Sequence, residues 1–500
     1  MSKLSGKNIL IFQQRQWGFT IGASLAKKFQ EEQNHLFAIT MKNTAFEYVT
    51  TQKDVKYEKI FNYDDIIYTP LSYEVPKDLT LETICKGLGI ATVWPLVSCV
   101  RKLTKNYGEK FYYSFRKRAS DEYIIAYIKS VYTFLKDILI NNKIDLVIMP
   151  VHASFVHVVA NLLCKQNNIK IVSVTDSKVE GVFLFANDTF FREGEFFNVL
   201  EREQHFHLEK VEQHLKKEKK KNEKEFIKLK REYSSVGDFF LKEMKFFYSL
   251  ILLLKKFAFN YTKAVNTLGP DIDFPTPYTM VRDHFVYKYQ RWKTRKYTGY
   301  SEFNDNKKYV YFPLQFQPEA QIDLFSPYFN NQIETARLVA QSLPGSLCLV
   351  VKEHPAMIGY RGVSYYEKLL GLPNVKLIRP DYNGHYLISK AEMIIAPVST
   401  TIFEGAVFNK PVIQLGNYGL TEKLPDVHVH TDLTSLPQKI LDVLEKGFDT
   451  KSHESHLKKW IGAVYETGFE LDYTKLWYDQ DSRQELFDEY WEHLKKEVCL

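Results

Sequence analysis

Short runs of apolar residues alternate with helix-length segments along most of this chain. In its second half, Leu347–Val351, Val375–Ile378 and Met393–Ala396 each end in a polar loop, and Val412–Leu415 follows a helix-length segment. Apolar runs of this length, bounded by polar loops, are typical of parallel strands that are buried on both faces. The pattern therefore predicts a parallel sheet covered by helices.

The first half of the chain shows the same alternation. Asn8–Phe12 is followed by a loop and a helix, and His35–Thr40 is a second predicted strand. Further along, the apolar runs Ile144–Pro150 and Ile169–Val174 lie on either side of a predicted helix, Phe155–Gln166. This succession predicts a second parallel sheet, so we expect an α/β protein with two Rossmann-like domains.

Residues 200–263 break the alternation. Their first part is polar, and residues 216–224 are mostly lysine, which indicates a solvated helical excursion. The later run Phe246–Leu254 is strongly apolar but too short to cross a bilayer, and it is flanked by Lys242, Lys245, Lys255, Lys256 and Lys263. Such a helix suits the surface of an anionic membrane, so we predict a peripheral membrane contact through residues 242–263. The alternative is a helix that packs on the protein core.

Length and these breaks divide the chain into four parts. Five hundred residues exceed one ordinary hydrophobic core. We expect an N-terminal Rossmann-like domain at 1–200, a helical basic insertion and linker at 201–300, a second α/β domain at 301–470 and a C-terminal helix at 471–500. The linker carries its own basic cluster, from Arg282 to Lys296.

Composition narrows the classes of protein that remain. Hydrophobic residues make up 45% of the chain, which excludes global disorder. The net charge of +7 is modest for this length, and no nucleic-acid recognition module accompanies either basic segment, so we expect no nucleic-acid partner. The five cysteines show no Cys-x-x-Cys spacing and the N-terminus has no secretory signal, which favours a reducing, cytoplasmic setting. A membrane contact would then lie on the inner face.

Polar loops follow three of the predicted strands in the second half. They contain His354-Pro355, Asp381–Gly384 and Ser399–Thr401. Ligands of open parallel sheets bind beyond the carboxyl ends of the strands, so these loops are expected at one rim of the sheet. This rim is the candidate site for a nucleotide.

Hydroxyl groups open the helix that follows the third of these strands. Ser399, Thr400 and Thr401, together with backbone N–H groups, can form an anion site at the helix N-terminus. The alternative is that Ser399 and Thr400 only cap the helix. Glu404 lies one turn into the helix, where its carboxylate can accept hydrogen bonds from ribose hydroxyls.

A histidine and several amides are the other candidates at this rim. Pro355 favours an extended conformation for His354 and so fixes the position of its imidazole. There the ring can donate to a phosphate oxygen or, as imidazolium, help a phosphate leave; the alternative is a structural histidine at a strand end. Gln315 and Gln317 are candidates for phosphate or the donor sugar, and Asn383 lies at the depth of a base.

The order of these motifs resembles a known family. The segments YFPLQFQPE, KEHP and PVSTTIFEGAVFNKPVIQLG, within residues 309–419, look like those of the capsule polysaccharide biosynthesis glycosyltransferases, which include Kdo transferases with HP and Ser/Thr motifs. The resemblance implies a GT-B fold, with two parallel sheets facing a cleft, and a sugar donor activated by CMP. It also implies that His354, Ser399 and Thr400 contact the nucleotide phosphate and that Glu404 contacts the ribose.

The same resemblance places the catalytic base in the first domain. Relatives carry an acidic residue in a loop after a buried strand, and here Asp176 and Glu180, in VTDSKVEG, are the best-placed carboxylates. A carboxylate facing the cleft can take the proton of an acceptor hydroxyl. This sequence lacks the Glu-Asp-Gly order common in relatives. His152 is a third candidate, and Asp176 can alternatively just begin a turn.

These features predict a glycosyltransferase that uses a nucleotide sugar, CMP-linked by preference, and a surface or capsular polysaccharide or glycolipid as acceptor. A CMP-sugar has one phosphate, which a histidine and a hydroxyl pair can stabilise, and no Asp-x-Asp pair lies at a plausible loop. We therefore expect no metal and no cofactor besides the nucleotide sugar. Three alternatives stay open: a CDP-alcohol polyol-phosphate transferase, a UDP-sugar 2-epimerase-like enzyme and a non-catalytic membrane-associated scaffold. The motifs do not distinguish inverting from retaining transfer.

Overall fold

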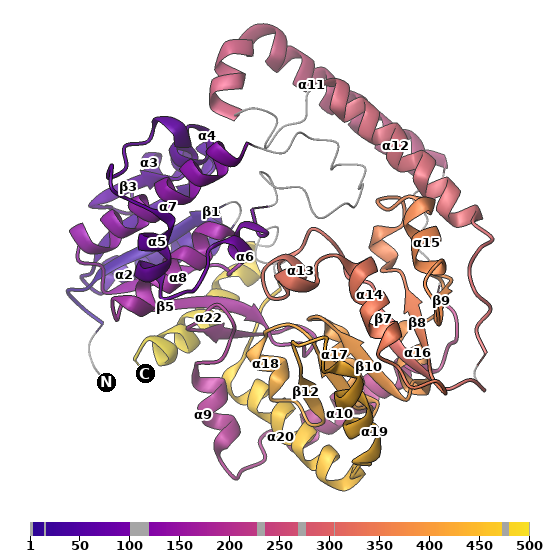
Figure 1. Ribbon diagram of the computed structural model, residues 1–500. Coiled ribbons are helices and arrows are strands. Elements are labelled where there is room, and N and C mark those ends of the chain that lie inside the picture. The colour runs from indigo at the N-terminus through magenta and orange to yellow at the C-terminus, as the bar shows by residue number, and fades with distance from the viewer. Residues whose placement is uncertain are drawn as a thin grey trace.

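Two α/β domains, each with its own sheet, form the body of the protein (Figure 1). The structure is a computed structural model, and it describes residues 4–14, 17–100, 120–227, 236–268, 277–304, 306–472 and 480–499. The predicted fold class, a pair of Rossmann-like domains with a helical insertion, is confirmed.

The first domain contains a seven-stranded sheet in the order β13-β6-β5-β4-β1-β2-β3. Five neighbouring strands are parallel, and β6 and β13 extend the sheet in antiparallel fashion. The strands are β1 (Asn8–Gln14), β2 (His35–Met41), β3 (Lys59–Asn62), β4 (Leu146–Met149), β5 (Lys170–Asp176), β6 (Val182–Ala186) and β13 (Phe469–Glu470). Because β1 pairs with both β2 and β4, the strand order reverses beside it, which creates a topological switch point.

Helices cover both faces of this sheet. Leu10 and Phe12 of β1 belong to one buried apolar cluster and Ile9 and Ile11 to another, so every residue of this run needs an apolar side chain. The helical segments are η1 (Gly18–Gly22), α2 (Ala23–Glu31), α3 (Asn43–Thr51), α4 (Asp64–Tyr68), α5 (Leu81–Leu88), α6 (Trp94–Val97), α7 (Asp121–Asn141), α8 (Phe155–Gln166) and α9 (Glu195–Glu201).

The second domain contains a six-stranded parallel sheet in the order β12-β11-β10-β7-β8-β9. Its strands are β7 (Tyr309–Pro313), β8 (Cys348–Lys352), β9 (Val375–Ile378), β10 (Met393–Ala396), β11 (Val412–Gln414) and β12 (Val427–Val429). The order reverses between β7 and β10, so this sheet also has a switch point. The helices are α13 (Ala320–Asp323), α14 (Gln332–Gln341), α15 (Val363–Leu370), α16 (Gly384–Lys390), α17 (Thr400–Val407), α18 (Gly419–Glu422), α19 (Leu436–Glu445) and α20 (Thr450–Thr467).

The end of the chain returns to the first domain. Phe469 of β13 pairs with Phe183 of β6, and the last helix, α22 (Gln480–Cys499), packs beneath the first sheet. The ring of Trp491 lies 5.1 Å from that of Phe29, in an edge-on contact. The predicted C-terminal helix is therefore part of the N-terminal domain's core.

The first part of the insertion packs on the body of the protein, so the expectation of a solvated excursion is wrong for α10 (Leu208–Lys219). Its Val211 and Leu215 are buried against α20 and α17. Its lysines pair with carboxylates on other elements, for example Lys217 with Glu180 at 3.0 Å and Lys219 with Glu454 at 3.4 Å. The short turn η4 (Lys220–Asn222) then lies against α16.

Two long helices, α11 (Val236–Leu268) and α12 (Pro277–Lys296), lie outside the layers of both domains. Figure 1 shows them along the upper edge of the molecule. α11 contacts α4 of the first domain, α12 contacts α15 of the second, and the two helices contact each other. Within the described ranges, no helix is both long and apolar enough to cross a membrane.

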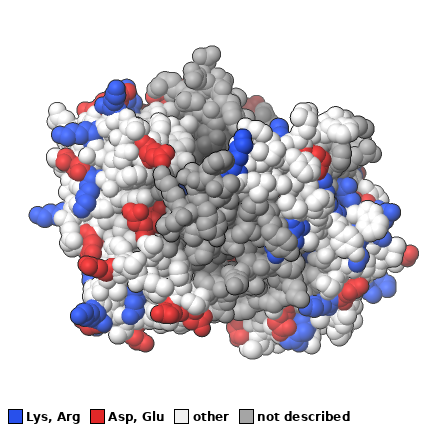
Figure 2. Space-filling view, turned by 90° about the horizontal axis from the view of Figure 1, so that it is seen from above, with Lys and Arg blue, Asp and Glu red and all other residues white. Residues whose placement is uncertain are grey.

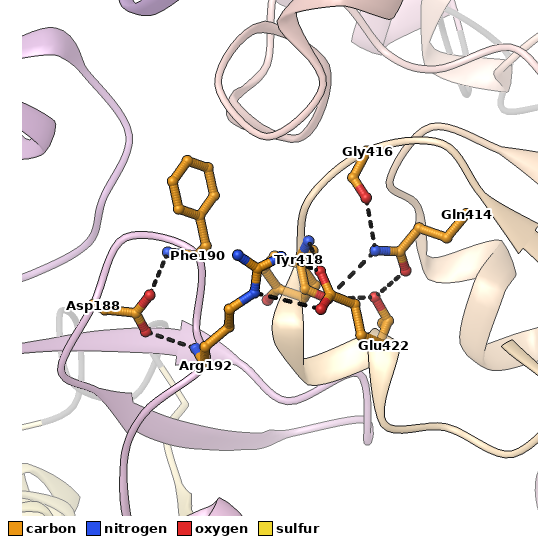
Figure 3. A network of polar contacts seen from close by, with 8 residues as sticks. Asp188, Phe190, Arg192, Gln414, Gly416, Tyr418 and Glu422 are labelled. Atoms are coloured by element: carbon orange, nitrogen blue, oxygen red, sulfur yellow. Dashed lines mark hydrogen bonds and ion pairs between the residues drawn. The ribbon is translucent and has the colours of Figure 1, made fainter. Parts of the chain in front are cut away.

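The two domains meet where β5 and β11 end. The hydroxyls of Thr175 and Tyr418 lie 3.0 Å apart, and the Gly419 backbone N–H donates to the Phe190 carbonyl at 2.7 Å. Figure 3 shows the neighbouring ion pair between Arg192 and Glu422, with 2.8 Å between Nη2 and Oε1. The carboxyl ends of these two strands, one from each sheet, therefore face each other.

Charge on the surface is mixed. Figure 2, a view from above, shows lysine and arginine interspersed with aspartate and glutamate on either side of the face. No single-sign field dominates the part of this face that is described.

Candidate functional site

The rim of the second sheet brings the predicted loops together. β8, β7 and β10 are adjacent strands, so the residues that follow them lie side by side at their carboxyl ends. These residues include Gln315, His354 and Ser399. The loop at 381–384 follows β9, which pairs with β8 in parallel, so the three predicted loops lie at one rim. This rim includes the switch point, where ligands bind in such sheets.

The helix α17 begins at the expected hydroxyl cluster. Ser399 is its N-cap: its Oγ accepts from the Thr401 backbone N–H at 3.2 Å and donates to Thr401 Oγ1 at 3.2 Å. The capping role is therefore real, and Ser399 and Thr401 are buried by it. Thr400 is exposed at the first turn, so it is the hydroxyl that a ligand can reach.

Glu404 lies in a cluster of charged and polar groups. Burial raises the pKa of its carboxyl, while His385 and Lys221 and a hydrogen bond from Thr400 oppose that rise. His385 Nε2 lies 3.7 Å from Glu404 Oε1. Burial and the nearby Glu404 likewise raise the pKa of the Tyr311 hydroxyl. A contact between Glu404 and ribose hydroxyls stays a prediction.

Lys352, at the end of β8, adds a cation beneath the rim. It is 5% exposed, and burial lowers its pKa to about 8 although Glu353, Glu404 and Asp381 oppose the shift. Among the residues that the structure describes, no carboxylate lies within ion-pair distance of its ammonium.

A buried ion pair that we did not predict holds the rim in place. Glu353 Oε1 lies 2.8 Å from Arg361 Nη1, and both side chains are essentially inaccessible to solvent. The carboxylate also accepts from the Tyr366 hydroxyl at 3.1 Å and from the His354 backbone N–H at 2.7 Å. Arg361 Nη2 donates to the Gln315 carbonyl at 3.0 Å, so one pair fixes the loops after β7 and β8. The signal available in the sequence was a charged residue between the strand and His354-Pro355.

His354 presents one ring nitrogen to solvent. Its Nδ1 accepts from the Ala356 backbone N–H at 3.2 Å, within the short turn that Pro355 begins. Partial burial lowers the pKa of the imidazole, an effect that Glu353 opposes and Lys352 and Arg361 reinforce. With Nδ1 accepting, the neutral ring carries its proton on Nε2. His354 is therefore an exposed donor at the rim.

Gln315 and Gln317 lie at the rim, but their side chains are buried and point into the protein. Gln315 Nε2 donates to the Pro313 carbonyl at 2.9 Å, and Gln317 Nε2 donates to the Asn330 carbonyl at 3.2 Å. Gln332 links the two, since its Nε2 donates to both. Their contacts favour a role in shaping the loop, while direct contact with phosphate or sugar stays a prediction.

Asn383 connects the second domain to the insertion. Its Nδ2 donates to the carbonyls of Lys221 and Lys224 at 2.6 and 2.8 Å, and its backbone N–H donates to the Glu225 carbonyl at 2.7 Å. Its Oδ1 caps α16 by accepting from the His385 N–H at 3.1 Å. These bonds occupy the amide that was predicted to meet a base.

The candidate bases of the first domain differ sharply in their surroundings. Asp176 ends β5 at the domain junction, is exposed, and pairs with Lys178 at 2.9 Å. Glu180 pairs with Lys217, which lowers the pKa of its carboxyl and makes it a weaker base. His152 is buried against Phe191, and burial lowers its pKa to about 3. Asp176 and Glu180 each pair with a lysine, and Asp176 is the one that ends a strand at the junction of the two domains; its role as a base stays a prediction.

The fold defines a class: a two-domain α/β protein whose second sheet has a switch point, the place where open parallel sheets bind ligands. Residues 277–425 match a family described as capsule polysaccharide biosynthesis protein. This confirms, for that stretch, the resemblance drawn from the sequence motifs, and it supports the expectation of a glycosyltransferase. No curated protein matches the chain significantly.

Several solved structures are similar to this chain at low identity. UDP-GlcNAc 2-epimerase from Neisseria meningitidis, bound to UDP-GlcNAc, is 11% identical, with 92% of this chain and 97% of that chain covered and a TM-score of 0.25. The beta Kdo 2,7 transferase of KpsC from Thermosulfurimonas dismutans is 12% identical, with 66% and 79% covered and a TM-score of 0.30. A glycosyltransferase from Rickettsia africae is 11% identical, with 99% of both chains covered and a TM-score of 0.25. Likenesses at this level carry no argument about the activity of this chain.

Proposed function

We propose that this protein transfers a sugar from a nucleotide donor, CMP-linked by preference, to a surface or capsular glycan or glycolipid. The observation that carries the proposal is the rim itself. His354 presents an Nε2–H donor and Lys352 supplies a cation at the end of β8, and Thr400 presents a hydroxyl at the helix N-terminus that follows β10, on the other side of β7. These groups suit the single phosphate that links CMP to a sugar.

In the proposed reaction, an acceptor hydroxyl oxygen attacks the anomeric carbon of the donor. Its proton passes to Asp176, which lies at the end of β5 that faces the second domain. The bond between the anomeric carbon and the phosphate oxygen breaks, and the negative charge that develops on CMP is stabilised by His354, Thr400 and Lys352. Glu404 accepts from the ribose hydroxyls. These groups neutralise one phosphate without a metal ion, so we propose metal-independent transfer.

Donor hydrolysis tests this function. The purified chain is incubated with CMP-, UDP- and GDP-sugars, and release of the free nucleotide is followed. We expect CMP release from CMP-sugars, and a loss of about 10²–10⁴-fold in His354→Ala, the range typical of one acid–base or hydrogen-bonding catalytic group. The melting temperature should fall only slightly, because His354 is exposed and its ring makes one capping bond, from the Ala356 N–H. Turnover of UDP-GlcNAc without acceptor would instead indicate an epimerase, and no turnover of any nucleotide sugar would refute the proposal.

We also place the enzyme in the cytoplasm, in peripheral contact with the inner face of a membrane through residues 242–263. Support comes from the part of α11 whose side chains are described, up to Lys255, where most of the large apolar side chains are exposed. Residues 256–263 lie beyond the side chains that the structure describes. A lipid-linked acceptor would be met at such a surface.

A further inference from the structure

Large apolar side chains are concentrated on the outside of α11. Among the described side chains, eight are between 48% and 66% exposed, namely Phe240, Leu241, Met244, Phe247, Tyr248, Ile251, Leu252 and Leu254. They recur at spacings of three, four and seven residues, so they form one stripe along the helix. A stripe of this size is unusual on the surface of a soluble domain and marks an interaction site.

The opposite side of α11 is already occupied. The Phe246 ring stacks on the His284 ring of α12 with 3.8 Å between centroids. Beside it, Glu243 lies 2.6 Å from Lys288 Nζ and 3.2 Å from His284 Nε2. The exposed stripe is therefore not the side with which α11 packs on α12, and the core-packing alternative accounts only for the inner side.

A second stripe, unforeseen in the sequence, lies on α12. Phe285, Tyr289 and Trp292 follow each other at spacings of four and three, and they are 58%, 53% and 54% exposed. The Lys293 ammonium lies 5.3 Å from the centroid of the Tyr289 ring, and the Lys296 ammonium lies 5.0 Å from that of the Trp292 ring. Aromatic rings beside lysines are the composition of segments that sit at the boundary between lipid and water.

The inner side of α12 is held by the second domain. Arg291 Nη1 donates to the Ile358 carbonyl at 3.2 Å, and the Tyr287 ring lies 5.0 Å from that of Tyr360. Both Ile358 and Tyr360 follow the turn that His354 and Pro355 begin. The helix therefore fixes its aromatic stripe relative to the candidate donor site.

We propose that α11 and α12 together form one docking surface for a membrane that contains anionic phospholipids. The charges beside the stripes favour an anionic membrane over a second copy of the chain as the partner of this surface. The exposed cations Lys245 and Lys255 of α11 and Lys293 and Lys296 of α12 accompany the stripes, whereas Glu243 is neutralised by Lys288. Two copies would bring like charges together, while an anionic leaflet supplies the opposite charge. The inference rests on the proposed peripheral contact. It goes further because it adds α12 to the surface and names the class of lipid.

Vesicle co-sedimentation of the full chain tests the surface. The probes are vesicles of phosphatidylcholine alone and of phosphatidylcholine with about a third phosphatidylglycerol, an anionic lipid. We expect strong binding to the anionic vesicles, weak binding to the neutral ones and a decrease with salt. The double variant Leu241→Ser/Trp292→Ser removes one side chain from each stripe and should lower the partition coefficient at least tenfold.

Matched controls come from the first domain. Leu71 and Trp94 are 60% and 52% exposed, close to the 59% of Leu241 and 54% of Trp292, and both lie outside the two stripes. Leu71→Ser/Trp94→Ser should bind vesicles as the unmodified chain does. Melting temperature and donor hydrolysis in solution, measured on every variant, should not change, so a failure of the membrane inference stays separate from a failure of the proposed activity.

Three results would overturn the inference. The unmodified chain fails to bind anionic vesicles, or the stripe variant binds as well as its control. Alternatively, light scattering shows a dimer that Leu241→Ser/Trp292→Ser dissolves, which would assign the surface to a second copy. If the single variants Leu241→Ser and Trp292→Ser each bind anionic vesicles more weakly than the unmodified chain, the result supports a surface that uses both helices.

Discussion

Replacing Glu353 by glutamine is the sharpest perturbation of the rim. The change keeps the shape of the side chain and removes its charge. Arg361 then remains buried, 1% exposed, without its counter-ion, and Tyr366 and the His354 N–H lose a charged acceptor. Because Arg361 also holds the Gln315 carbonyl, the loops after β7 and β8 should both loosen.

The expected loss of unfolding free energy follows from the burial of the Glu353–Arg361 pair. Breaking a buried ion pair by removing one partner costs about 3–5 kcal/mol, because it leaves an uncompensated buried charge. An exposed pair offers a control of the same chemistry: Arg337 lies beside Glu334 on α14, with side chains 36% and 46% exposed. Glu334→Gln should change the unfolding free energy by less than about 0.5 kcal/mol, as expected for a surface pair.

Chemical denaturation followed by circular dichroism measures these differences, with donor hydrolysis measured in parallel. We expect Glu353→Gln to lower the denaturation midpoint and to raise KM for the donor, since His354 and the β7 loop are no longer held. The double variant Glu353→Leu/Arg361→Met removes both charges and should recover part of the lost stability. It should not recover donor binding, because the anchors of the two loops are still missing.

A stability loss in Glu353→Gln no larger than that in Glu334→Gln would refute the reasoning, because it would mean that the pair is not electrostatically buried. An unchanged KM in a stable Glu353→Gln variant would show that the pair has no role in positioning the rim. Recovery of both stability and KM by the double variant would contradict the argument in the same way.

Three further perturbations address other parts of the site. The Lys352 ammonium is mostly charged below its pKa of about 8 and mostly neutral above it, so donor affinity should fall as pH rises through that value. In Lys352→Met, the rise of KM for the donor near this pH should be absent. Asp176→Asn should lower kcat by about 10²–10⁴-fold with little change in donor KM, whereas Glu180→Gln should leave kcat nearly unchanged, and equal losses in both would contradict the assignment. Asn383→Ala removes the bonds to Lys221 and Lys224, so limited proteolysis should cut the segment after α10 faster than in the unmodified chain.

The sequence by itself determined β1, β2, β4 and β5 of the first sheet and the rim of the second, but not β3 or the antiparallel pairings of β6 and β13. Strands that are buried on both faces require continuous apolar runs, and such runs can be recognised without knowing their neighbours, as with Val375–Ile378 and Met393–Ala396. Because parallel strands share the direction of their carboxyl ends, the placement of His354 and Ser399 at one rim followed from the strands alone. The helix cap at Ser399 is equally local, since its partner is Thr401.

Only the tertiary structure decided what the polar residues at that rim contact. Asn383 meets Lys221 across 162 residues of sequence, and Glu180 meets Lys217 across 37, so neither pairing leaves a periodic or local signal. The docking of α10 was missed because a lysine-rich sequence predicts a solvated helix. The carboxylates that pair with its lysines lie on other elements and are brought beside it only by the fold. The Glu353–Arg361 pair was missed for the same reason: a buried charge is tolerated only where its partner folds against it, and that partner is chosen by packing.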